Sequence, residues 1–168
     1  MIGHNLTRET STRMAWESHF GVTVALERLR VPVGPTVGYG PLLIDSTGLI
    51  IALWRLRLAA TMSAAIPGET ATIEAAVEMF DAELPGLKRL RDVTMHFDNY
   101  ALENGQRRNT IGNPPRLIGA ADLWEFGHTP KSYTWLDVTI DYDTAQTAAR
   151  TLYDAIQESN NSQLEYDF

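Results

Sequence analysis

Three side chains suited to acid–base chemistry lie close together in the middle of the chain, in the segment Leu90-Arg91-Asp92-Val93-Thr94-Met95-His96-Phe97-Asp98-Asn99-Tyr100. Histidine exchanges a proton near neutral pH, so His96 is a candidate general acid or base. Arginine binds phosphate oxygens through two parallel hydrogen bonds, so Arg91 is a candidate phosphate ligand. Asp92 precedes His96 by four residues, a spacing that places both on one helix face and lets the carboxylate orient the imidazole. These residue types predict metal-independent chemistry at a phosphate ester.

The spacing of Arg91 and His96 sets a geometric condition on that chemistry. Five residues correspond to about 140° around an ideal α-helix, so the two side chains do not converge unaided. Either the long arginine side chain swings round the helix, or a second copy of the chain completes the site. Arg13 and His19 repeat a similar spacing, but an apolar residue follows that arginine.

Basic residues are concentrated around the same segment. Between residues 88 and 116, six basic side chains outnumber three acidic ones, although the whole chain carries a net charge of −7. A positive region on an acidic protein suits an anionic ligand held at one place. A solvated helix face followed by a charged loop explains the same pattern. The residues expected to contact that ligand are Lys88, Arg89, Tyr100, Arg107 and Arg108.

Other classes of protein are excluded by what the sequence lacks. There is no cysteine, which removes disulfides, thiolate nucleophiles and zinc ribbons. The sequence contains no phosphate-binding glycine loop and no paired-histidine metal motif, so we expect neither a cofactor nor a metal. The first eighteen residues are polar, unlike a secretory signal. The charge-free stretch 46–54 is too short for a membrane span, and we expect a cytoplasmic protein.

The periodicity of apolar residues predicts the elements that hold these side chains. We expect a single domain, 1–168, that is mainly α: an antiparallel bundle of four to five helices with a small C-terminal β-hairpin. Pro67-Gly68 and Pro85-Gly86 separate the middle helices. An N-terminal arm, 1–9, precedes the helical core, 11–102. The expected elements are helices at 11–30, 46–65, 71–84 and 87–102, a loop at 106–116, a hairpin within 117–140, a C-terminal helix at 143–158 and a disordered tail at 159–168. The strands of the hairpin are expected at 123–126 and 132–140, joined by a turn at 127–131. Asp141 or Asp143 is expected to cap the C-terminal helix, whose inner face is formed by Ala145, Ala148, Leu152 and Ala155 or Ile156.

The fourth expected helix carries a pattern that resembles the motif of HEPN domains, in which an arginine precedes a histidine by a few residues. Its members here are Arg91, the polar Asp92 after it, and His96. These domains are small helical bundles of toxin–antitoxin and phage-defence systems. The resemblance covers roughly residues 11–102. It implies a metal-independent endoribonuclease or RNA-binding relative, with Arg91, Asp92 and His96 as catalytic residues. It also implies a homodimer that brings two motifs into one cleft, with the fourth helix at or beside the interface, and it allows for an antitoxin-like protein partner.

Two other functions remain open on the sequence alone. A non-catalytic, partner-binding helical module would use the acidic surface to meet a basic protein. A nucleotide- or small-molecule-binding protein would use the Gly38-Tyr39-Gly40 loop as the roof of a pocket. In either case Arg91 would form a surface ion pair with Glu83 or Asp98, and His96 would be partly buried. The four tryptophans are expected in the core or on the hairpin: Trp16, Trp54, Trp124 and Trp135. His128 is expected in a solvated turn.

Overall fold

The computed structural model describes residues 2–32, 40–66, 70–103 and 109–162, and this part of the chain is mainly helical with a small C-terminal antiparallel sheet. The helices are α1 (Ile2–Leu29), α2 (Gly40–Ala64), α3 (Thr70–Glu83), α4 (Leu87–Met95), α5 (Phe97–Ala101) and α6 (Tyr142–Ser162). Two short strands, β1 (Thr110–Ile111) and β2 (Arg116–Leu117), are followed by the 3₁₀ helix η1 (Ala121–Trp124). The strands of the larger sheet are β3 (Phe126–Thr129), β4 (Ser132–Trp135) and β5 (Val138–Asp141).

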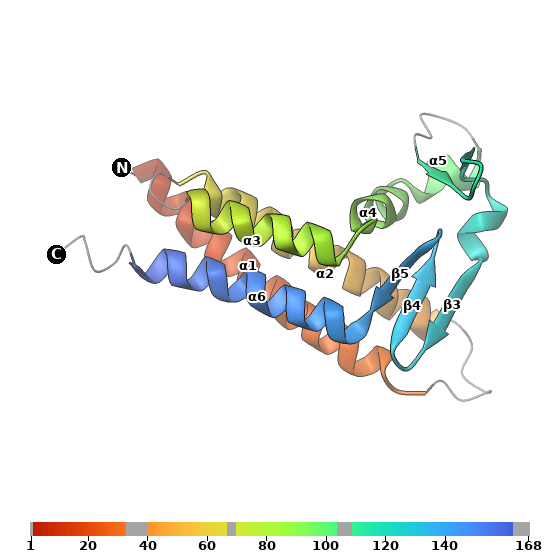
Figure 1. Cartoon of the computed structure of the whole chain (residues 1–168), viewed down its shortest axis with the longest axis horizontal. Coiled ribbons are helices and arrows are strands. Elements are labelled where there is room, and N and C mark those ends of the chain that lie inside the picture. The colour runs from red at the N-terminus through yellow and green to blue at the C-terminus, as the bar shows by residue number, and fades with distance from the viewer. Residues whose placement is uncertain (1, 33–39, 67–69, 104–108, 163–168) are drawn as a thin grey trace.

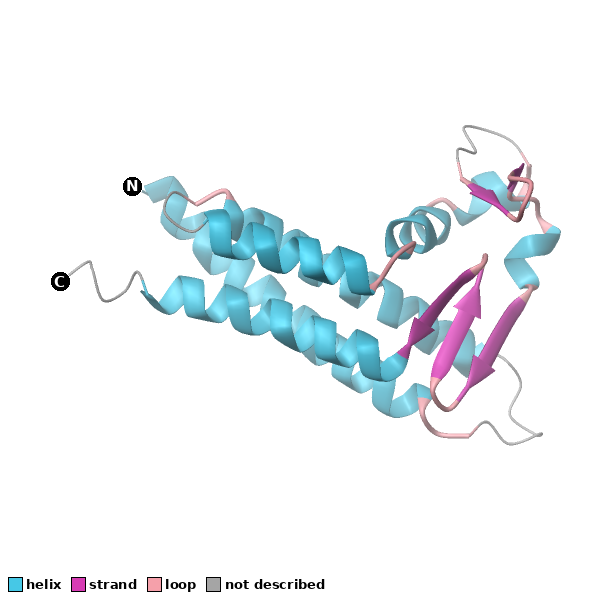
Figure 2. Ribbon diagram, viewed as in Figure 1, coloured by secondary structure: helices cyan, strands magenta, loops and turns pink. Residues whose placement is uncertain are grey.

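The long helices α1, α2, α3 and α6 lie side by side, and each runs in the direction opposite to the one before it (Figure 1). α1 packs against α2 and α6, and α3 packs against the same two helices. The strands gather at the end of the molecule away from both described termini (Figure 2). α4 lies at that end too, turned across the long helices beyond the end of α3 (Figure 1). No helix in the described ranges is both long and apolar enough to cross a membrane.

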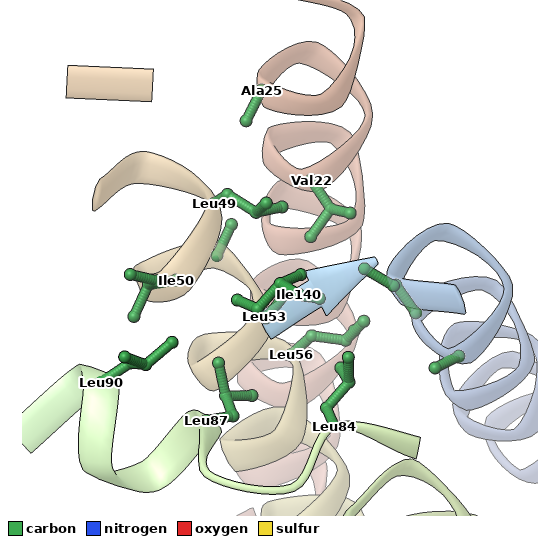
Figure 3. Packing of buried hydrophobic residues seen from close by; sticks show 14 of the residues in the cluster. Val22, Ala25, Leu49, Ile50, Leu53, Leu56, Leu84, Leu87, Leu90 and Ile140 are labelled. Carbon is green, nitrogen blue, oxygen red and sulfur yellow. The ribbon is translucent and has the colours of Figure 1, made fainter. Parts of the chain in front are cut away.

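The core is built around α2, whose Leu49, Ile50, Leu53 and Leu56 are all buried. Three leucines at the end of α3 and along α4 lie against this helix (Figure 3). The first lies in the turn just after α3, and the other two are three residues apart, which keeps them on one face of α4. Burying an aliphatic side chain of this size contributes about 1.5–3 kcal/mol, so these contacts hold α4 in place against α2. The three residues are Leu84, Leu87 and Leu90.

A glycine fixes the turn between α3 and α4. Gly86 is the N-cap residue of α4 and has φ +89°, in the left-handed region that glycine adopts without a steric penalty. A Cβ at this position would lie 2.6 Å from Val138 Cγ2, so the turn is packed directly on β5. The break that Pro85-Gly86 predicts is therefore confirmed.

The helix boundaries correct several expectations. α1 already begins at Ile2, so the expected N-terminal arm 1–9 is helical from its second residue. α2 begins at Gly40 rather than Ser46, because Pro41 falls in the first turn, where its missing N–H costs nothing. α6 extends to Ser162, so the tail expected to be disordered from 159 onward is helical over its first four residues. The expected helix over 71–84 corresponds closely to α3.

The β region is more elaborate than a hairpin. The segment 132–140, expected as one strand, forms two, β4 and β5, and β4 is the middle strand that pairs antiparallel with β3 on one side and with β5 on the other. The turn between β4 and β5, Leu136–Asp137, has positive φ at both residues. The segment 123–126, expected as a strand, lies mostly in η1, whereas 127–129, expected as a turn, belongs to β3. Part of the expected loop 106–116 pairs as β1 and β2.

Three side chains lie where the sequence did not place them. Trp16 and Trp124 are 58% and 63% exposed, so neither belongs to the core. Trp135, by contrast, is buried in β4, in agreement with the expected place in the core or on the hairpin, and its indole N–H donates to Leu123 O at 3.2 Å. His128 is half-buried in β3 rather than solvated, with Nε2 2.9 Å from Leu29 O.

Candidate functional site

The candidate site lies on α4, and its best-defined member is Arg91. The guanidinium forms an ion pair with Asp92, Nη1 to Oδ1, at 2.7 Å. It also stands 4.3 Å from the ring centroid of Trp54 on α2. About a quarter of each side chain of the pair is exposed, so the arginine is neither freely solvated nor sealed in the core. Asp92 and Trp54 together hold the cation in one place, and neither Glu83 nor Asp98 pairs with it.

His96 lies just past the end of α4. The helix expected over 87–102 is broken there: His96 has φ −126° and ψ 34°, and α5 begins at the next residue. Its backbone N–H donates to Asp92 O at 3.2 Å and Val93 O at 3.3 Å, and its carbonyl accepts from the Asn99 N–H at 3.0 Å. These bonds fix the backbone while the residue is exposed, unlike the partly buried position considered above.

The structure does not join the two halves of the motif within one chain. Among the side-chain contacts of the described residues, no hydrogen bond or ion pair connects the His96 imidazole with the side chain of Arg91 or of Asp92. Arg91 turns toward Trp54 of α2, whereas His96 is exposed beyond the C-terminal end of α4. A single copy therefore holds the Arg91 guanidinium on α4 and the exposed His96 just past the end of that helix, with no hydrogen bond or ion pair between the two side chains.

The five residues expected to contact RNA have different surroundings. Lys88 is exposed, and its side-chain ammonium forms no hydrogen bond or ion pair with any of the described residues. Arg89 donates from Nη1 to Thr110 O at 3.0 Å and so ties α4 to β1. Tyr100 is only 4% exposed, and its hydroxyl accepts a hydrogen bond from the Asn109 amide at 2.8 Å. That burial takes the ring away from the surface. Arg107 and Arg108 lie outside the described residues.

Sequence reasoning missed a second arginine beside Trp54. Arg57 stands 5.3 Å from the Trp54 ring centroid and donates two hydrogen bonds to Asp81 of α3, each 2.6 Å long. The hydrogen bonds that it donates to Asp81 raise the pKa of the Arg57 guanidinium above its ordinary value. The signal was present in the sequence, because Trp54 and Arg57 are three residues apart and share a face of the same helix.

A pocket of about 170 Å³ opens beside these groups, where α2, the end of α3 and the start of α4 meet. Trp54, Arg57 and Lys88 all line it. Within the described ranges, no three side chains of the kinds that ligate metals gather closely enough to hold a metal ion. The chemistry available on α4 is thus that of guanidinium, ammonium, carboxylate and imidazole groups.

Comparison with protein-family models, with curated proteins and with solved structures finds no match for the chain. The interpretation of the site therefore depends on its residues. The Gly38-Tyr39-Gly40 loop, considered above as the roof of a nucleotide pocket, lies outside the described residues except for Gly40, the first residue of α2.

Proposed function

We propose that this protein is a HEPN-like, metal-independent endoribonuclease or RNA-binding relative of a toxin–antitoxin or phage-defence system. The observation that carries the proposal is the fixed position of Arg91 on the helix that ends at an exposed His96. A cation already held in place can stabilise charge on a phosphate without first being reorganised. The ion pair with Asp92 and the Trp54 ring supply that order.

The proposed reaction uses the nucleophile that RNA itself carries. The 2′-oxygen attacks the adjacent phosphorus, and the bond from phosphorus to the 5′-oxygen breaks, leaving a 2′,3′-cyclic phosphate and a 5′-hydroxyl. The proton of the 2′-hydroxyl passes to a base, and the departing 5′-oxygen takes a proton from an acid. Imidazole fits either role near neutral pH, and Arg91 would bind the phosphate oxygens. Asp92 would keep the guanidinium in position.

A homodimer would satisfy the geometry that one chain leaves incomplete. The base and the acid act on opposite sides of the phosphorus, so two imidazoles, one from each copy, suit the reaction better than one. Apolar side chains exposed near His96 support an interface there, because such patches mark protein contacts. Met95 and Leu102 flank α5, and Trp124 lies 5.6 Å, centroid to centroid, from Phe97.

The test is cleavage of single-stranded RNA in the presence of a chelator by the wild type and by Arg91→Ala and His96→Ala. Arg150→Ala is a matched control, because this arginine is 77% exposed on α6. Loss of a general acid or base costs about 10²–10⁴-fold in rate, and loss of one donor that stabilises charge in the transition state costs about 10²–10³-fold, so both site variants should fall by at least 100-fold. Equal activity in all four proteins would remove the catalytic claim. Light scattering of a Met95→Glu variant, expected to be monomeric and inactive, tests the dimer.

A second candidate function is favoured by one feature of α1. Trp16 and Phe20 stack one turn apart at 6.0 Å and 7°, and both are more than half exposed. Exposed aromatic pairs of this kind are enriched at protein interfaces. The chain would then be a non-catalytic module that binds a basic protein partner. One stable partner recovered with the wild type but lost with Phe20→Glu, together with no RNA cleavage, would favour this function.

A further inference from the structure

The pocket at the start of α4 has a composition that the proposed reaction does not account for. It lies between α2, the last residues of α3 and the first turn of α4, and has a volume of about 170 Å³. Leu84 and Leu87 form apolar walls, and Trp54 adds an aromatic one. Liquid water occupies about 30 Å³ per molecule, so the space suits a sugar–phosphate unit and is too small for a whole nucleotide with its base.

The charged residues that line this pocket favour an anion. Two are cationic, Arg57 and Lys88, and one is acidic, Asp81. Asp81 already accepts two hydrogen bonds from Arg57, so its charge is matched within the pocket. Lys88 is left without an acidic partner among the described residues. An ammonium in this position attracts a phosphate as a point charge.

The pocket and the candidate site share one side chain, Trp54. Trp54 lines the pocket and also packs under the Arg91 guanidinium at 4.3 Å. Lys88 and Arg91 are three residues apart on α4, a spacing that places two side chains next to each other on a helix surface. A polyanion lying along this helix would therefore meet two cations in succession.

We propose that the pocket of Trp54, Arg57 and Lys88 binds a backbone phosphate of the single-stranded RNA whose neighbouring phosphate lies at Arg91. This inference rests on the proposed function, because it assigns a positioning subsite to the same substrate. The ammonium of Lys88 and the outer edge of the Arg57 guanidinium contact the phosphate oxygens. The apolar walls and the indole pack against the sugar.

The experiment measures binding separately from cleavage. A single-stranded RNA oligonucleotide with 2′-O-methyl groups lacks the nucleophile, so it binds without being cut. Fluorescence anisotropy gives its Kd for the full-length wild type, for Lys88→Ala and for Lys131→Ala. Lys131 is a matched control, because it is exposed beside β4 and is the only other lysine of the chain. Circular dichroism confirms that the exposed substitutions leave the helices intact.

The expected result is a Kd about five- to tenfold weaker for Lys88→Ala and within twofold of the wild type for Lys131→Ala. Removing one phosphate contact should also reduce the slope of log affinity against log salt by about one. An unchanged Kd and slope for Lys88→Ala, or equal losses in both variants, would overturn the proposal. The proposal would also be overturned if inorganic phosphate raised the melting temperature of the wild type but not of Lys88→Ala, while the wild type did not bind the oligonucleotide.

The outcomes also separate this subsite from the nuclease itself. If Lys88→Ala weakens binding while unmodified RNA stays uncut by the wild type, the subsite stands and the catalytic proposal fails. If the wild type cuts RNA and Lys88→Ala binds as the wild type does, only the subsite fails. If the wild type neither binds nor cuts RNA, both proposals are wrong.

Discussion

Replacing Gly86 by alanine tests how the site-bearing helix is held to the rest of the fold. At φ +89° an alanine is strained by about 1–2 kcal/mol, since the left-handed region crowds its Cβ against the backbone. The new methyl would also lie 2.6 Å from Val138 Cγ2, and overpacking of this kind costs about 1–3 kcal/mol. Restricting the unfolded chain returns about 0.4–1 kcal/mol. We expect a net loss of about 2–4 kcal/mol in the free energy of unfolding.

Gly48→Ala is the matched control for this substitution. Gly48 lies inside α2, and an added Cβ there would meet no atom within 4 Å. Because alanine is the better helix former, this variant should gain about 0.5–1 kcal/mol. Urea unfolding followed by circular dichroism at 222 nm compares the two variants with the wild type. The same substitution should therefore have opposite signs at the two glycines.

The result that would refute the reasoning is a Gly86→Ala variant within about 0.5 kcal/mol of the wild type, which lies inside the range of an ordinary surface change. If Gly86→Ala fails to fold, the double variant with Val138→Ala decides the cause. Removing the valine methyl groups relieves the clash, so the double variant should be less destabilised than the two separate effects predict. Additive losses would show that Val138 does not oppose the new methyl.

Two further predictions concern pH. The hydrogen bonds from Arg116, with one from the Gly119 N–H, lower the pKa of Asp122 below its ordinary value. The charged form therefore stabilises the fold above the unfolded pKa, and this stabilisation is lost as the pH falls through the folded pKa. Asp122→Asn should cost about 1.5–3 kcal/mol at pH 7 and progressively less below about pH 4 by urea unfolding, and a constant difference would contradict this. Burial lowers the pKa of His19, which stacks on Tyr153 at 4.6 Å, so protonation opposes folding as the pH falls below about 6.5. His19→Phe should reduce the loss of stability between pH 7 and pH 5. If the free energy of unfolding fell in parallel with pH for the two proteins, burial of His19 would not be the cause of the loss.

The sequence predicted the elements whose signals are local. The Pro85-Gly86 pair separates α3 from α4, because neither residue continues a helix through this turn, whereas Pro67-Gly68 lies outside the described residues. The inner face of α6 was also predicted, since Ala145, Ala148, Leu152 and Ile156 recur at helical spacing and are buried. The N–H of Thr144 donates to Asp141 Oδ1 at 2.9 Å, which confirms an expected cap of that helix.

The break at His96 could not be predicted from periodicity. The buried positions of α4 end at Val93, and the half-buried Phe97 and the buried Tyr100 of α5 continue them at intervals of four and three residues, so the pattern is that of one unbroken helix. No glycine or proline marks the break. The turn at Leu136–Asp137 escaped prediction for a related reason. Its positive φ values occur at residues that seldom adopt them, and the Gly112 N–H, distant in sequence, donates to Asp137 Oδ2 at 2.6 Å.

The candidate site likewise contains residues that the sequence predicts and a contact that only the fold reveals. Its titratable residues could be named from the sequence, because arginine, aspartate and histidine are conspicuous at short spacing. The partner that orders Arg91 could not, because Trp54 precedes it by thirty-seven residues and reaches it only through the packing of α2 against α4. A tryptophan at an apolar helix position is most simply assigned to the core. Only the fold shows that its ring contacts two guanidinium groups and also lines a pocket.

A net charge of −7 does not by itself oppose RNA binding at α4. Exposed charges farther apart than about 8 Å are largely screened at physiological ionic strength, so the affinity depends on the groups near the strand. Around the pocket these are Lys88, Arg57 and Arg91, of which two are matched by their own acids. At low salt the screening length grows to about 30 Å at 0.01 M, and the acidic remainder of the chain then repels the RNA. The affinity should therefore fall less steeply with added salt than the number of phosphate contacts alone would give, because screening weakens the repulsion as well as the attraction.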